Sequence, residues 1–172
     1  MRYHSILGLA TSLMLSTALA AASEPSDPQI AHIAYTAGDL DIKAAQLALE
    51  KSKTESVRAF ANDMVRDHKA VNDKALALVK KLGVTPEDND TSKGLVKQAE
   101  EKHAELSMLS GAAFDKAYVD NEVAFHKTVN GALAATLIPS AGNAELKSLL
   151  QTGLKIFEGH LQHAEKLASA TH

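Results

Sequence analysis

The sequence predicts an all-α fold, in which four long helices form an up-down bundle accompanied by one short helix. Two patterns lead to this prediction: apolar residues recur at alternating spacings of three and four over long segments, and no segment of useful length alternates as a strand does. Composition agrees, because alanine is abundant and aromatic residues make up only 4% of the chain. Small residues of this kind are typical where helices pack closely.

The first part of the chain is expected to direct export. Residues 1–22 have a basic residue near the start, then an apolar run, then small residues suited to cleavage, and so resemble a secretory signal peptide. Residues 23–29 are polar, contain two prolines, and are expected to be a flexible lead-in. We therefore expect a periplasmic or secreted protein with a single helical domain over residues 30–169.

Two long helices are expected in the first half of that domain. One covers about 30–52, with Gly38 as a weak point in its middle. The second covers about 55–82, with Thr54 as its N-cap and Gly83 at its end. A single polar residue, His68, interrupts the apolar face of the second helix. That face comprises Val57, Ala61, Met64, His68, Val71, Ala75, Leu78 and Leu82.

Three further helices are expected after the loop at residues 85–90. The first, at about 92–109, is short and polar, which favours an external position as a crossover element. A long helix at about 112–138 ends at a turn over residues 139–143, and a last helix follows at about 144–169. Short links produce antiparallel hairpins, and a long link between two hairpins is the crossover of ferritin-like bundles.

Several function classes lack support in the composition. The chain has no cysteine, so it has neither a thiolate nucleophile nor a thiolate metal ligand. Its net charge of −3 gives no electrostatic reason to bind nucleic acid or an anionic membrane. No glycine-rich phosphate loop and no nucleophile-elbow motif occur, so the sequence favours a non-enzymatic protein. A homo-oligomer stays open, because Tyr35, Ile42 and Leu49 lie outside the main apolar stripe of the first helix.

Polar residues at core positions form the candidate site. The segments 60–72 and 118–130 align without gaps, and each places a histidine where a core residue is expected. These histidines, a third on the last helix and an aspartate on the first all lie near the middle of their helices, so similar depths in the bundle are expected. The candidate metal ligands are Asp41, His68, Glu122, His126 and His160, with His163 as a further option.

Two interpretations of this group stay open. In one, it is a structural histidine–carboxylate layer that fixes helix register in an exported structural, binding or stress-related protein. In the other, it binds zinc, copper or iron as a mononuclear or dinuclear site. Asp67 is expected to be a surface charge, because it points about 100° away from its neighbour His68.

A ferritin-like redox enzyme is disfavoured by spacing. A di-iron centre needs Glu-x-x-His pairs on two helices. The three core histidines are preceded at that distance by Val65, Val123 and Phe157. The one such pair present, Glu100 and His103, falls on the short polar helix and is expected to face solvent.

Four sequence runs carry a resemblance to a known family. They are AGDLDIKAAQLALEKS, VRAFANDMVRDHKAVNDKAL, LSGAAFDKAYVDNEVAFHKTV and LKIFEGHLQHAEKL, and the resemblance covers about residues 30–168. The chain resembles the bacterial domain-of-unknown-function family 4142. The resemblance implies a ferritin-like fold and export, and no established activity. The family's acid in the first helix matches Asp41, and its helix histidines match His68, His126 and His160. Phe125 stands where the family often has an acid.

Overall fold

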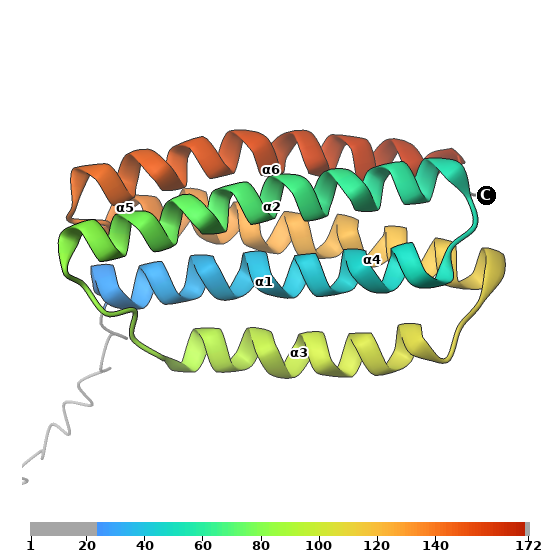
Figure 1. The fold of residues 1–172 in the computed structure, drawn as a ribbon, viewed down its shortest axis with the longest axis horizontal. Coiled ribbons are helices and arrows are strands. Elements are labelled where there is room, and N and C mark those ends of the chain that lie inside the picture. Colours follow the sequence, from blue (N-terminus) through green and yellow to red (C-terminus); the bar gives the residue numbers. More distant parts are fainter. Residues whose placement is uncertain (1–23, 171–172) are drawn as a thin grey trace, which may run out of the picture.

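A computed structural model describes residues 24–170, which form an all-helical fold, as predicted (Figure 1). The signal peptide expected at residues 1–22 lies outside the described residues. Four long helices run along a common axis, and a shorter fifth lies beside them. The long helices are α1 (Asp27–Lys51), α2 (Glu55–Leu82), α4 (Gly111–Ala132) and α6 (Ala144–Ala170), and the shorter helix is α3 (Asp90–Ser107).

The helices alternate in direction along the chain, and α3 determines how the two hairpins are joined. Helix α1 is antiparallel to α2, and α4 is antiparallel to α6 (Figure 1). Because α3 returns along the whole length of the molecule, α2 and α4 run in the same direction. Helix α3 lies alongside α1, on the side away from α2 and α6 (Figure 1).

Helix α1 begins earlier than the sequence predicts. Residues 27–29, expected in the flexible lead-in, are already helical. Pro28 is compatible with this position, because the amides of the first turn have no partner inside the helix. The Asp27 carboxylate also accepts hydrogen bonds from the amides of Gly142 and Asn143, both at 2.8 Å. These bonds connect the start of α1 to the turn before α6.

The end of α4 also differs from the prediction. The chain continues through a π-helical turn, η1 (Leu133–Leu137), and a last helical turn, α5 (Ile138–Ser140), so Pro139 is helical. Proline lacks an amide hydrogen and crowds the preceding turn of a helix. The wider π-helical turn immediately before it accommodates both effects.

Thr54 is the N-cap residue of α2, as predicted, but its hydroxyl does not accept a hydrogen bond from the first turn. No side-chain bond caps α2; the Thr54 hydroxyl instead donates to Asp115 Oδ2 on α4, at 2.5 Å. The predicted stop at Gly83 is confirmed, with φ of 64° in the left-handed region that glycine adopts most easily.

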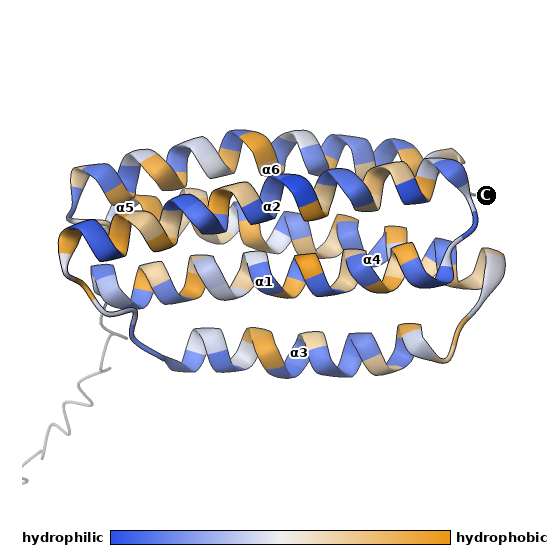
Figure 2. Ribbon diagram, viewed as in Figure 1, coloured by the Kyte–Doolittle hydropathy of each residue, from blue (hydrophilic) through white to orange (hydrophobic). Residues whose placement is uncertain are grey.

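The hydrophobic core is divided into two parts along the bundle axis. In Figure 2, hydrophobic and hydrophilic positions alternate along the long helices, as amphipathic helices require. One part of the core contains Val57, Phe60, Met64, Phe114, Tyr118, Val119, Ala164 and Leu167, and the other contains Ile30, Ile33, Leu133, Leu137, Leu146, Leu150 and Phe157. Polar side chains separate the two parts on every long helix.

Gly38, expected only to weaken α1, is required by the packing of α1 on α2. A Cβ at this position would collide with the side chain of Asn72. Asn72 is buried, and its amide donates to the backbone carbonyl of Tyr35 at 3.3 Å. The absence of a side chain at Gly38 therefore lets Asn72 bridge the two helices.

We expect Gly38→Ala to destabilise the protein by about 1–3 kcal/mol, because Asn72 must move and its bond to Tyr35 is lost. Urea denaturation of both proteins measures the change. Gly159→Ala is the matched control, since a Cβ there meets no neighbouring atom within 4 Å. That control is expected to gain about 0.5–1 kcal/mol. Equal effects of the two substitutions would contradict this account of Gly38.

Candidate functional site

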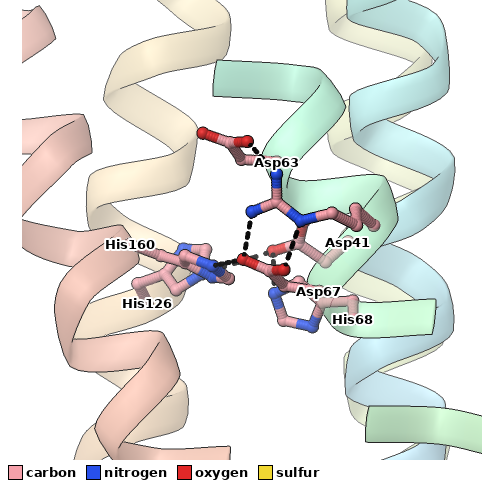
Figure 3. A network of polar contacts seen from close by, with 7 residues as sticks. Asp41, Asp63, Asp67, His68, His126 and His160 are labelled. Atoms are coloured by element: carbon pink, nitrogen blue, oxygen red, sulfur yellow. Dashed lines mark hydrogen bonds and ion pairs between the residues drawn. The ribbon is translucent and has the colours of Figure 1, made fainter. Parts of the chain in front are cut away.

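Five buried polar side chains meet at mid-bundle, between the two parts of the core. Every predicted ligand except His163 belongs to this group, and each of the five is at most 7% exposed. Figure 3 shows three histidine side chains and Asp41 converging from different helices. The group consists of Asp41 on α1, His68 on α2, Glu122 and His126 on α4, and His160 on α6.

The three histidines form a nearly equilateral triangle. Their ring centroids are 5.7 Å apart for His68 and His126, 5.3 Å for His68 and His160, and 5.4 Å for His126 and His160. Each ring offers one nitrogen that lies within 4.8 Å of the nitrogens of the other two. Phe157, one of the residues that replace a di-iron glutamate, stacks on the His68 ring at 4.4 Å and orients it.

Asp41 faces two of these rings. Its Oδ2 atom lies 3.5 Å from His68 Nε2 and 3.6 Å from His126 Nε2. Both distances exceed those of an ordinary N–H···O hydrogen bond. Glu122 lies close by, and Asp41, Glu122 and His126 each offer an atom within 4.8 Å of the other two.

A backbone bond determines which nitrogen of His126 is free. His126 Nδ1 lies 3.0 Å from the backbone carbonyl oxygen of Glu122. A carbonyl oxygen only accepts, so Nδ1 must carry the hydrogen. In the neutral ring, Nε2 then carries the lone pair, and this is the nitrogen that faces Asp41.

Asp67 orients the ring of His160, as the backbone carbonyl of Glu122 orients that of His126. Asp67 is therefore not the simple surface charge that was expected. His160 Nε2 donates to Asp67 Oδ2 at 3.0 Å, so Nδ1 of the neutral ring has the lone pair. The 100° offset that turns Asp67 away from His68 directs it toward α6. Arg66 binds both Asp67 oxygens, at 2.7 and 2.9 Å, and Asp63 at 2.6 Å (Figure 3).

Apart from an interaction between the carboxyl groups of Asp41 and Glu122, the potential ligand atoms at the centre of the group have no hydrogen-bond partner among the described residues. They are both carboxylate oxygens of Asp41, both ring nitrogens of His68, Glu122 Oε2, His126 Nε2 and His160 Nδ1. Buried polar atoms in folded proteins are nearly always hydrogen-bonded. Buried ligand atoms that lack a partner outside the group therefore indicate a place where something other than a protein side chain binds.

Comparison with known protein families identifies the chain. The model of DUF4142, described as a domain of unknown function, matches residues 13–167. The chain belongs to the DUF4142 family. No curated protein matches it.

Two solved structures share the fold of this DUF4142 chain. A DUF305 fragment from Deinococcus radiodurans superposes with a TM-score of 0.72 at 14% identity, covering 86% of this chain and 99% of that one. A DUF305 protein from Streptomyces coelicolor, described by name as secreted, superposes with a TM-score of 0.71 at 11% identity, covering 83% and 91%. Within residues 24–170, none of the helices is both long and apolar enough to cross a membrane.

Burial keeps the histidines of the DUF4142 site neutral. It lowers the pKa of His68 well below its ordinary value and that of His126 to about 4. Burial also lowers the pKa of His160, although its bond to Asp67 acts in the opposite direction. Neutral imidazole is the form that binds metals, so all three rings are ready to act as ligands near pH 7.

The two buried carboxyl groups shift in the opposite direction. Burial raises the pKa of Asp41 to about 7. Burial, together with the nearby charge of Asp41, raises the pKa of Glu122 well above its ordinary value. Two carboxylates this close cannot both ionise easily without a cation, so the pair retains a proton in the absence of one.

The remaining candidates lie elsewhere. His163 is exposed, and its ring packs edge-on against Phe60 at 5.1 Å, in one half of the apolar core. It belongs to neither group of converging ligand atoms found among residues 24–170. Glu100 and His103 are exposed on α3, as expected for a solvated face. The sequence did not indicate the contact between Asp67 and His160, because the two residues lie on helices far apart in the chain.

Proposed function

We propose that this protein binds a single transition-metal ion through His68, His126, His160 and Asp41. The observation that carries the proposal is a pair of overlapping groups of buried ligand atoms, one from His68, His126 and His160 and the other from Asp41, Glu122 and His126, with the atoms of each group within 4.8 Å of one another. Two ligands that each lie 2.0–2.1 Å from a tetrahedral ion are about 3.4 Å apart. The separations of Asp41 Oδ2 from His68 and His126, at 3.5 and 3.6 Å, are close to that value.

Histidine tautomers favour one ion over two. The two groups of converging atoms share His126, whose Nδ1 is engaged by a backbone carbonyl. His126 therefore has one lone pair to give, and cannot serve two ions at once. Glu122 then lies beside the ion, where it can complete the coordination or accept a hydrogen bond from a bound water.

The ligand set restricts the choice of metal. Three neutral imidazoles and one carboxylate suit zinc, copper and iron, and no thiolate is available for softer coordination. The helix directions support a ferritin-like bundle. Di-iron redox chemistry has less support, because Val65, Val123 and Phe157 occupy the positions of the required glutamates.

A purely structural layer is the second candidate, and burial of the five residues supports it. In a structural layer, however, the polar atoms are expected to satisfy one another. Here Asp41 and the histidines approach to distances too long for hydrogen bonds.

The description of the Streptomyces relative as secreted supports an exported protein, so metal binding outside the cytoplasm is the function we infer.

Metal titration of tag-free protein tests the proposal. Chelated protein titrated with cobalt(II) is expected to bind one ion per chain and to show the visible absorption of a tetrahedral nitrogen–oxygen site. Zinc should then displace the cobalt in equal amount. A binding stoichiometry near zero, or cobalt spectra unchanged by His126→Ala, would refute the metal centre and leave the structural layer.

The role of Asp67 gives a further prediction. Carboxylates that hold a metal-binding histidine typically contribute 10–100-fold to affinity, so Asp67→Ala is expected to weaken zinc binding by about that factor. Asp63→Ala is the matched control, because Asp63 contacts Arg66 and not His160. The control should bind zinc within about threefold of the wild type. Competition with a chromophoric chelator measures both, and equal losses would show that Asp67 does not position His160.

A further inference from the structure

A cavity of about 140 Å³ lies inside the bundle, next to the proposed metal centre. All four long helices line it, and the ring of His68 forms part of its wall. The cavity exists because each of these helices contributes a glycine or an alanine to the lining. Side chains this small do not reach across the space between packed helices. They include Gly38 on α1, Ala75 on α2, Ala132 on α4 and Gly153 on α6.

The lining of this cavity is apolar. Among the described residues it contains no Asp, Glu, Lys or Arg, and most of it is leucine, valine, phenylalanine and alanine. Two of the polar side chains are already bonded, since Asn72 donates to the backbone carbonyl of Tyr35 at 3.3 Å and Thr128 to that of Ala124 at 3.0 Å. The polar lining residues are His68, Asn72, Thr91 and Thr128.

The other two polar residues offer no hydrogen bond inside the cavity. Thr91 is exposed, so solvent satisfies its hydroxyl group. Both ring nitrogens of His68 are inaccessible, and the flat ring stacks on Phe157, also a lining residue, with 7° between the ring planes. A buried water needs two to four polar partners, which this lining does not supply, so the cavity is expected to stay dry.

We propose that this cavity binds one small, uncharged, apolar molecule of about the size of benzene. In other proteins an apolar core cavity of about 150 Å³ stays dry and binds benzene or xenon. The rings of His68, Phe125 and Phe157 line the cavity and favour an aromatic ligand through stacked or edge-on contacts. The lining residues Thr91 and Ala132 are exposed, so the cavity approaches the surface between α3 and α4, where such a molecule would enter.

This inference goes beyond the metal centre and does not require it. Titration of metal-free protein with benzene tests the cavity, and titration with cobalt tests the centre, so either can fail while the other holds. If both hold, a molecule in the cavity lies against the ring of His68, one of the proposed metal ligands. Uncharged apolar molecules would then be the class of compound that approaches the metal from this side.

Calorimetric titration of the chelated, tag-free protein with benzene tests the inference. We expect saturable binding of one molecule per chain, with a dissociation constant of roughly 0.1–1 mM. Phenol has the same ring and adds a hydroxyl group that the lining cannot satisfy, so it is expected to bind at least about tenfold more weakly. Absence of saturable binding up to the solubility limit of benzene, or equal affinity for phenol, would overturn the proposal.

Nuclear magnetic resonance of methyl groups locates the bound benzene. Val71 and Leu150 line the cavity, whereas Val57 and Leu106 lie in the other part of the core and do not line it. In protein labelled at valine and leucine methyl groups, we expect nuclear Overhauser contacts from benzene to Val71 and Leu150 and to neither of the other two. Any other pattern among these four residues would place benzene elsewhere and refute the site.

A change at Gly153 tests the position of the molecule. In Gly153→Ala the added Cβ would lie 3.4 Å from Phe157 Cε2 and 3.8 Å from Val71 Cγ1, which are ordinary contact distances, so the variant is expected to fold. Its methyl group occupies part of the cavity and should weaken benzene binding at least about threefold.

Gly159→Ala is the matched control, because it is the same substitution on the same helix at a position that does not line the cavity. It should bind benzene as the wild type does, and circular dichroism confirms that both variants are folded. Equal affinities of the two variants for benzene would show that benzene does not lie against Gly153, and the proposed position would be wrong.

Discussion

Asp41→Asn is expected to stabilise the metal-free protein increasingly as pH rises from 4 to 8. The pH-dependent part of the gain is about 2–4 kcal/mol. Asp41 is almost completely buried, and burial raises its pKa to about 7 from an ordinary value of 3.8. Asparagine is nearly the same size and does not ionise, so it avoids the penalty of a buried charge.

The sign follows from proton binding in the two states. Between the unfolded and folded pKa values of Asp41, the folded protein holds a proton that the unfolded chain has released. The contribution of Asp41 to the stability of the wild type is thus largest below about pH 4 and is lost as pH rises through 7. The asparagine variant lacks this loss, so the difference between the two proteins grows across that range.

Urea denaturation in the presence of a chelator, at pH 4 and pH 8, measures this difference. Asp39→Asn is the matched control, because Asp39 lies on the same helix and forms an exposed ion pair with Lys43. It should show little pH-dependent gain. The same free-energy change for Asp41→Asn at both pH values would contradict the raised pKa and the strain of the buried acid.

Loss of a metal ligand has the other large expected effect. At a free zinc concentration 100 times the dissociation constant, zinc is expected to raise the unfolding free energy of the wild type by about 2.7 kcal/mol. His126→Ala removes a nitrogen that faces Asp41, and the gain from zinc at the same concentration is expected to disappear. Asp41→Asn should behave similarly, becoming more stable without metal and less responsive to it.

Thermal denaturation with and without zinc measures these gains. His103→Ala is the control, because His103 is exposed on α3 and belongs to neither group of converging ligand atoms. It should keep the full response to zinc. A zinc response that is lost in His103→Ala and kept in His126→Ala would place the metal on the surface and refute the buried centre.

Stability and function oppose each other at Asp41. The same burial that makes its charge unfavourable in the metal-free protein leaves its oxygens free for a cation. A cation at the centre would neutralise Asp41 and Glu122 together, and so remove the reason for their raised pKa values. A residue such as Asp41, which destabilises the metal-free fold, is expected at a position where evolution has favoured metal binding over stable packing of the core.

Much of the fold was predictable because helices are local. The bounds of α2 follow from the spacing of its apolar residues and from Gly83, and the histidines at core positions indicate the level of the site along the bundle. Errors occurred where a distant segment decides the outcome: at Asp27, which binds the turn before α6, and at Thr54, which binds Asp115.

The sequence by itself determined that the chain is helical and that His68, His126 and His160 are turned toward the core, since periodicity specifies which face of a helix is buried. Only the tertiary structure decided what those histidines meet. The tautomer of His160 depends on Asp67, 93 positions earlier, and the distances from Asp41 depend on how α1 packs against α2 and α4. Helix packing brings these atoms together through contacts between distant parts of the chain. The spacing of apolar residues within one helix does not specify the distances between atoms on different helices.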